Sequence, residues 1–191
     1  MKENHYMQKL FLAARLTTSP TIEAYLTEYH RQFGFAKMRW IEPQYLHITL
    51  KFFGPTDNNT AQKIIDVVNE TTRQMEPINL NITKLNIFGS KHAAKVLWWG
   101  IDEEALLTTT AQHLQTGFNT IGLYADRQNF VPHISLARII DVRTKSFFQK
   151  QLSKYHLLEP TIPFNINSLL LMESKISRQG VAYSEIARFQ L

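Results

Sequence analysis

Cysteine is absent from the 191-residue sequence, which excludes disulfides, a thiolate nucleophile and cysteine-ligated zinc. Long apolar runs are absent too: no stretch approaches the roughly 18 consecutive apolar residues that a membrane-spanning helix needs. The first residues, 1–5, lack the apolar segment of a secretory signal. We therefore expect a soluble, cytoplasmic protein with no membrane partner.

Acidic side chains are in the minority: the chain has 16 Asp and Glu against 21 Lys and Arg, so its formal net charge is +5. This excess favours an anionic partner such as nucleic acid, although a merely basic soluble protein fits the charge equally well. No linker or low-complexity segment divides the chain, and 44% of its residues are hydrophobic. A chain of this size can bury an ordinary core, so we expect one domain over residues 1–191, as a monomer.

One short pattern occurs twice. A histidine, an isoleucine, a hydroxyl residue and a leucine occupy residues 47–50, and the same order returns at residues 133–136, 86 positions later. Side chains alternate along a strand, so His47 and Thr49 share one face and His133 and Ser135 share another, with the aliphatic residues packed behind them. Two such strands facing each other would form a site with two imidazoles and two hydroxyls.

The elements around the two motifs also recur in order. Apolar periodicity and the breaks at Ser19-Pro20, Gly54-Pro55 and Gly122 predict strand, helix, histidine strand, helix and strand twice, with Gly54-Pro55 ending the first histidine strand. We interpret this as an internal duplication with approximate repeats at residues 8–88 and 94–173. The expected fold is α+β, with two pseudo-symmetric lobes of antiparallel sheet flanked by helices and the active cleft between them.

Strict alternation assigns the neighbouring side chains to faces. Lys51 shares the face of the first motif and is a candidate for substrate binding at the cleft rim. Arg138 falls on the face opposite the second histidine, which leaves phosphate binding and a structural ion pair equally open. Phe88 is a candidate for stacking on a nucleobase, with core packing as the alternative. Trp98 and Trp99 face opposite ways, so at most one of them lines the cleft.

The two motifs and their flanks resemble the two-histidine (2H) phosphoesterases, and most closely the LigT-like RNA 2',3'-cyclic phosphodiesterases, once described as 2'-5' RNA ligases. The likeness is carried by residues 47–49 and 133–135, with lead-ins at residues 40–46 and 130–132. A single His-x-Thr recurs constantly by chance, whereas two copies at half-chain spacing with these flanks are specific. Ser135 stands where threonine is commoner, which keeps the hydroxyl.

The resemblance implies hydrolysis of an RNA 2',3'-cyclic phosphate end to a 2'-phosphomonoester, with reversible 2'-5' ligation as a side activity. It also implies that His47 is the proton donor and His133 the proton acceptor, roles that the symmetry of the two motifs leaves open. Arg138 matches the arginine that often closes the family's second motif.

The chemistry suits these residue types. Histidine serves as acid or base near neutral pH because its pKa is about 6.5, and Thr49 and Ser135 would donate hydrogen bonds to the nonbridging phosphate oxygens. We expect no cofactor or metal, since each motif supplies one good ligand and no carboxylate cluster has the spacing of a hard-cation site. Two alternatives stay open: a phosphodiesterase of small cyclic nucleotides or 2'-5' oligonucleotides, and a non-catalytic module that binds RNA ends.

Overall fold

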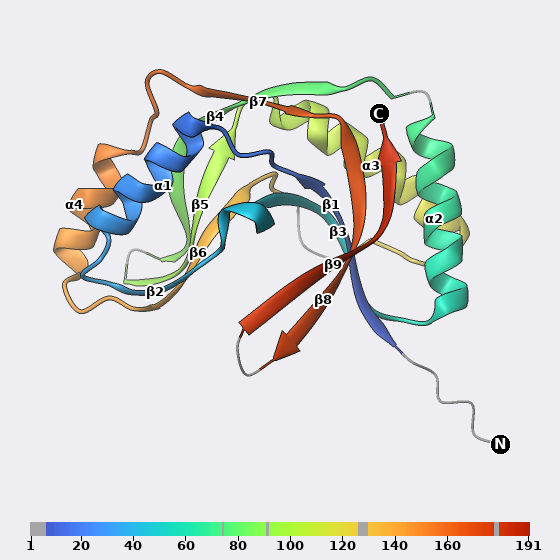
Figure 1. Ribbon diagram of the computed structural model, residues 1–191, viewed down its shortest axis with the longest axis horizontal. Helices are drawn as coiled ribbons and strands as arrows, with labels where there is room; N and C mark the ends of the chain where they lie inside the picture. Colours follow the sequence, from blue (N-terminus) through green and yellow to red (C-terminus); the bar gives the residue numbers. More distant parts are fainter. Residues whose placement is uncertain (1–6, 74, 91, 126–129, 178–179) are drawn as a thin grey trace.

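The computed structural model describes residues 7–73, 75–90, 92–125, 130–177 and 180–191, and it shows an α+β fold built on one curled antiparallel sheet (Figure 1). The strands are β1 (Gln8–Arg15), β2 (Lys37–Trp40), β3 (His47–Thr56), β4 (Ile78–Ser90), β5 (Ala93–Ile101), β6 (Ile134–Asp141), β7 (Ile162–Ile166), β8 (Ser168–Ser177) and β9 (Gly180–Gln190). The helices are α1 (Pro20–Gln32), α2 (Asn58–Thr72), α3 (Glu104–Thr120) and α4 (Lys145–Lys154), with a short 3-10 turn, η1, at Pro43–Tyr45. None of these helices has the length and apolar character needed to cross a membrane.

Side-chain caps begin the first two helices, and the first lies at Ser19-Pro20, where the sequence predicts a break. The Ser19 hydroxyl accepts a hydrogen bond from the backbone N–H of Ile22, and proline occupies the first helical position. At the start of α2, the Asp57 carboxylate accepts from the backbone N–H of Thr60. Gly122 follows the end of α3 with a φ of 80°, a left-handed conformation that glycine adopts without strain.

The sheet has nine strands in the order β7-β4-β5-β6-β3-β1-β8-β9, with β2 paired to β6. Helices α1 and α4 lie together over one lobe, and α2 and α3 over the other (Figure 1). Each lobe contains strands from both halves of the chain: β4 of the first half lies beside β5 of the second, and β8 of the second half lies beside β1 of the first. The predicted α+β class with two antiparallel lobes is confirmed, and the two lobes share one continuous sheet.

Positions that resemble each other in sequence pair with each other in the sheet. Ile48 of β3 lies opposite Ile134 of β6, and Leu80 of β4 lies opposite Phe164 of β7. Antiparallel pairing of two equivalent residues is what a twofold axis between them would produce. The duplication over residues 8–88 and 94–173 stays a prediction, and these pairings support it.

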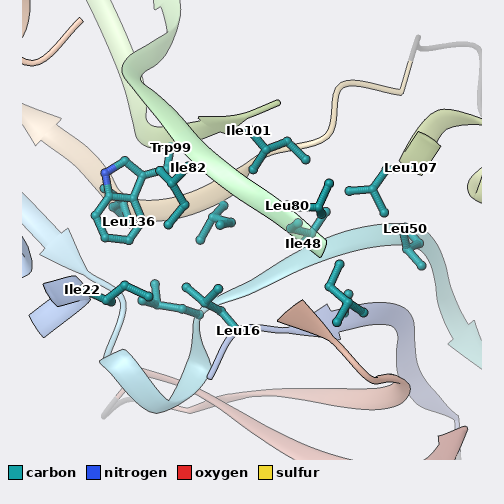
Figure 2. Close-up of a cluster of buried hydrophobic side chains, with 14 of the residues drawn as sticks. Leu16, Ile22, Ile48, Leu50, Leu80, Ile82, Trp99, Ile101, Leu107 and Leu136 are labelled. Atoms are coloured by element: carbon teal, nitrogen blue, oxygen red, sulfur yellow. The ribbon is translucent and has the colours of Figure 1, made fainter. Parts of the chain in front are cut away.

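Helices cover one face of the sheet, and the main hydrophobic core lies beneath them. Ile48, Leu136 and Leu107 belong to this core, and Figure 2 shows them among the buried side chains around Trp99. The Trp99 indole N–H donates to the Tyr29 hydroxyl over 3.2 Å, and both side chains are fully buried. Because Trp99 points into this core, the side chain of Trp98 lies on the opposite face of β5, as alternation predicts.

The first histidine strand does not end at Gly54-Pro55 as the sequence predicts, because β3 continues to Thr56. Beside it, β1 continues as well, and Gln8 lies opposite Thr56. Beyond Ile48, no described strand pairs with the edge of β3 that faces away from β1. The backbone N–H that Pro55 lacks is therefore not needed for a hydrogen bond to a strand on that edge. Gly54, with a φ of 74°, absorbs the irregular register at this point.

The buried Tyr29–Trp99 hydrogen bond generates a stability prediction. Tyr29→Phe should lower the free energy of unfolding by about 1–3 kcal/mol, because the indole N–H would stay buried without an acceptor. Urea denaturation followed by circular dichroism would measure the change. Tyr25→Phe is the matched control, since Tyr25 lies on the same helix and is only half-buried; equal losses in both variants would contradict the assigned role.

Candidate active site

The two histidine strands meet at one residue pair, Ile48 opposite Ile134, in antiparallel register. Both isoleucines are buried in the core beneath the sheet. The residues on either side of this pair point to the opposite, open face, with His47 toward Ser135 and Thr49 toward His133. Side chains on such a diagonal lie about 7–8 Å apart, so the two imidazoles flank a space that one phosphate group can fill.

Each imidazole is held in the same way. The Nδ1 atom of His47 lies 2.6 Å from the carbonyl oxygen of Tyr45, and the Nδ1 atom of His133 lies 2.7 Å from the carbonyl oxygen of Val131. A carbonyl oxygen only accepts, so Nδ1 carries the proton and donates in both rings. Each ring therefore presents Nε2 for proton exchange, and in both cases the anchoring carbonyl lies two residues earlier in the chain.

Aromatic side chains pack beside both rings. Phe11 and Tyr183 lie 5.2 and 5.6 Å from the ring of His47, centroid to centroid. Phe88 and Trp98 lie 4.7 and 5.9 Å from the ring of His133, both edge to face. This packing fixes the orientation of each imidazole and excludes water from its flanks.

Burial lowers the pKa of both histidines. The largest effect on His47 is its removal from water, which disfavours the charged ring; the Tyr45 carbonyl opposes this, and the nearby charge of His133 lowers the pKa further. Burial also lowers the pKa of His133, and the Val131 carbonyl opposes it. Both rings are therefore mainly neutral near pH 7 in the empty site.

The hydroxyls of Thr49 and Ser135 lie on the same open face and are half-buried. Neither hydroxyl has a hydrogen-bond partner among the residues that the structure describes. Both are thus available to donate to an oxygen of a bound group. The four side chains that the sequence singles out as catalytic candidates come together at one place.

Two cavities open beside the histidines. The smaller, about 300 Å³, adjoins His47 and is lined by Tyr45, Tyr183 and Met172 among others. The larger, about 710 Å³, adjoins His133 and Thr49 and reaches polar side chains of α3. A phosphate between the imidazoles would have room for an organic group on either side.

Both histidine strands carry a β-bulge at the leucine of the motif, which strict alternation does not anticipate. In β3, Thr49 and Lys51 lie opposite consecutive residues of β1, so Leu50 is the extra residue; in β6, Ser135 and Ala137 lie opposite consecutive residues of β5, so Leu136 is extra. An extra residue reverses the side-chain alternation beyond it.

The bulges correct the predicted faces of Lys51 and Arg138. Lys51 turns away from the open face, and its ammonium donates to the Gln115 side chain at 2.8 Å and to the Tyr124 carbonyl at 2.9 Å, although it still lines the larger cavity. Arg138 turns toward the open face and is exposed there, on the same side as His133.

Phe88 lies at the site rather than in the core. Its ring stacks on Trp98, with 4.8 Å between centroids, and it lines the larger cavity next to His133. Phe88 therefore borders the cavity beside His133, with one face of its ring covered by Trp98.

Sequence reasoning missed the aromatic side chains around His47. Phe11 belongs to a strand that reads as apolar throughout, and only its position opposite Phe52 places it on the open face. Tyr183 comes from β9 and reaches His47 because the sheet curls; nothing in its local sequence signals this.

No group of three or more His, Asp or Glu side chains gathers to hold a metal ion within the described part of the chain. The histidine pair therefore stands without a neighbouring carboxylate cluster there.

Comparison with known proteins gives consistent matches. Residues 18–176 match the family described as the 2'-5' RNA ligase superfamily. The RNA 2',3'-cyclic phosphodiesterase of Methanothermobacter thermautotrophicus is 25% identical over 156 residues, covering 82% of this chain and 84% of the relative. The protein of the same name from Aquifex aeolicus is 28% identical over 158 residues, covering 80% and 81%.

Solved structures share the fold. The crystal structure of TT0787 of Thermus thermophilus matches with a TM-score of 0.77 and 19% identity, over 96% of this chain and 97% of the other. The crystal structure of E. coli LigT complexed with 3'-AMP matches with a TM-score of 0.75 and 18% identity, over 97% and 98%. The resemblance read from the two histidine motifs is confirmed at the level of the family, because the match spans most of the chain: this protein belongs to the 2'-5' RNA ligase superfamily.

Proposed function

We propose that this protein hydrolyses the 2',3'-cyclic phosphate at an RNA end to a 2'-phosphomonoester, with His47 and His133 as general acid and general base. The observation that carries the proposal is the matched pair of imidazoles, each anchored through Nδ1 and each presenting Nε2 on one open face. The names of the relatives support the substrate class. The net charge of +5 suits a polyanion.

The proposed reaction is an in-line displacement at phosphorus. Nε2 of His133 takes a proton from water as the water oxygen attacks, and the bond from phosphorus to the ribose O3' breaks on the opposite side. Nε2 of His47 gives its proton to the departing O3', which leaves the phosphate on O2'. Thr49 and Ser135 donate to the nonbridging oxygens, where charge concentrates in the transition state. The same displacement with the 5'-hydroxyl of a second RNA in place of water breaks the same bond to O3' and forms a 2'-5' phosphodiester, which is ligation.

A general acid must hold a proton when the substrate is bound. In the empty site burial favours the neutral form of both rings. An anionic phosphate between them favours the charged form of whichever ring it touches, so substrate binding itself raises the pKa of the acid. The site therefore charges one histidine only when the group to be protonated is present.

The proposal predicts that both histidines are required. His47→Ala and His133→Ala should each lower kcat/KM on RNA with a 2',3'-cyclic phosphate end by at least about 100-fold, because each removes one proton-transfer partner. The assay follows the 2'-phosphate product in the presence of EDTA. His156→Ala is the matched control, since His156 is exposed and lines neither cavity. Most of the activity surviving in either test variant would refute the mechanism, and absence of turnover by the wild type would favour an RNA-end-binding module.

The lowered pKa values predict the pH dependence. The profile of kcat/KM should be a bell bounded by the pKa values of the free protein, one for the group that must be protonated and one for the group that must be neutral. Because burial lowers both below the ordinary value of about 6.5, the maximum should lie on the acidic side of pH 6.5. Steady-state kinetics from pH 4.5 to 8.5, a range of about four units, would measure it. A maximum above pH 7 would show that another group governs the rate.

The hydroxyls should act on the transition state. Thr49→Val removes the hydroxyl while keeping the branched shape, and it should lower kcat by about 100-fold, the usual effect of deleting one donor to a developing oxyanion. Thr49→Ser is the control that restores the hydroxyl and should recover most of kcat. Rapid-quench kinetics with saturating substrate would separate kcat from KM; equal losses in both variants would assign Thr49 a packing role.

A further inference from the structure

Two arginines face each other across the strands β2 and β6. Arg39 lies directly opposite Arg138, and both side chains are exposed. The pairs on either side, Trp40 with Ala137 and Met38 with Ile139, pack on the core beneath the sheet. Since side chains alternate, the two guanidinium groups emerge together on the open face.

This open face is the one that carries the histidine site. Ser135 lies opposite Trp98, which contacts His133, and Arg138 lies opposite Val96, two residues farther along β5. The bulge at Leu136 is what brings Arg138 to this face. Because Leu136 is the extra residue of a bulge, Ser135 and Arg138 are separated by the two-residue step from Trp98 to Val96 on β5, which corresponds to roughly 7 Å along the sheet.

The arginine pair has no compensating charge in the part of the chain that is described. Neither guanidinium has an ion pair or a hydrogen bond with a described residue, and like charges directly opposite each other destabilise a sheet. The next pair in the same ladder, Lys37 opposite Asp141, combines opposite charges. Arg39 and Arg138 are thus an exception within their own ladder, and an anion bound across them would remove the repulsion.

We propose that Arg39 and Arg138 together form a subsite for a backbone phosphate of the RNA chain, upstream of the reacting end. The proposal rests on the proposed function and names its substrate class: a polymeric RNA end rather than a cyclic mononucleotide. A cyclic mononucleotide has a single phosphate, which the histidines hold, and leaves the arginine pair empty. An oligonucleotide continues from the reacting ribose with one phosphate per nucleotide, and its path along β6 brings an upstream phosphate to the pair.

Arg39 is then a residue that determines specificity rather than one that touches the reacting phosphorus. It comes from β2, whereas His47 begins β3 and His133 immediately precedes β6, so its contribution is separable from the catalytic step. Two guanidinium groups side by side hold a phosphate through several charge-assisted hydrogen bonds. Their effect should appear in KM and in the dependence of binding on salt.

The experiment compares two substrates in one variant. Arg39→Gln should lower the ratio of kcat/KM on a short oligonucleotide with a 2',3'-cyclic phosphate end to kcat/KM on 2',3'-cyclic AMP by about 10-fold, mainly through KM for the oligonucleotide. The slope of log KM against log salt for the oligonucleotide should become shallower by about 0.7, the value for one phosphate contact on a single strand. Arg73→Gln is the matched control, because it removes the same charge from an exposed ion pair with Glu70 at the end of α2 and should leave the ratio unchanged.

Each outcome has a separate meaning. An unchanged ratio with Arg39→Gln, or an equal fall with Arg73→Gln, would overturn the subsite. Equal losses on both substrates would place Arg39 at the reacting phosphate and would also overturn it. Fluorescence anisotropy with an oligonucleotide that ends in a 2'-phosphate tests the subsite without turnover: weaker binding by Arg39→Gln than by Arg73→Gln supports it even if the proposed hydrolysis fails, and equal binding overturns it even if hydrolysis is found.

Discussion

The pairing of Ile48 with Ile134 is the contact on which the site depends. It joins two strands of the same local sequence in antiparallel register, so each strand presents its histidine beside the hydroxyl residue of the other. The isoleucines are buried beneath the sheet, and their burial fixes which face carries the polar side chains. A slip of one residue would turn both histidines into the core, and the register is therefore secured by the hydrophobic effect rather than by the polar groups themselves.

Such a site can exist because helices cover only one of the two faces of the sheet. The helices bury the aliphatic side of the strands, and Trp99 and Leu80 are among the side chains of this buried cluster (Figure 2). On the other face, aromatic side chains take the place of helices and flank the imidazoles at ring-centroid distances of 4.7 to 5.9 Å. Partial burial lowers the pKa of both histidines, while backbone carbonyls hold their Nδ1 protons, so the geometry is set before any ligand arrives.

Equivalent strands nevertheless produce a site with two different sides. The bulge at Leu50 turns Lys51 toward α3 and leaves Phe52 exposed on the open face, 5.8 Å from Phe11. The bulge at Leu136 instead exposes Arg138 beside Arg39. One lobe thus offers an apolar surface next to the histidines, and the other offers two cations.

The sequence by itself determined the α+β class, the order of elements, the two histidine motifs and the family, because these depend on alternation, helix caps and spacing, which are local properties of the chain. It also predicted that at most one of Trp98 and Trp99 would reach the cleft. Only the tertiary structure decided the faces of Lys51 and Arg138, the continuation of β3 past Gly54, and the approach of Tyr183 to His47. Bulges and contacts between distant strands depend on the register of each strand with its neighbours, and that register is set by packing of the whole sheet rather than by the residues on either side of a position.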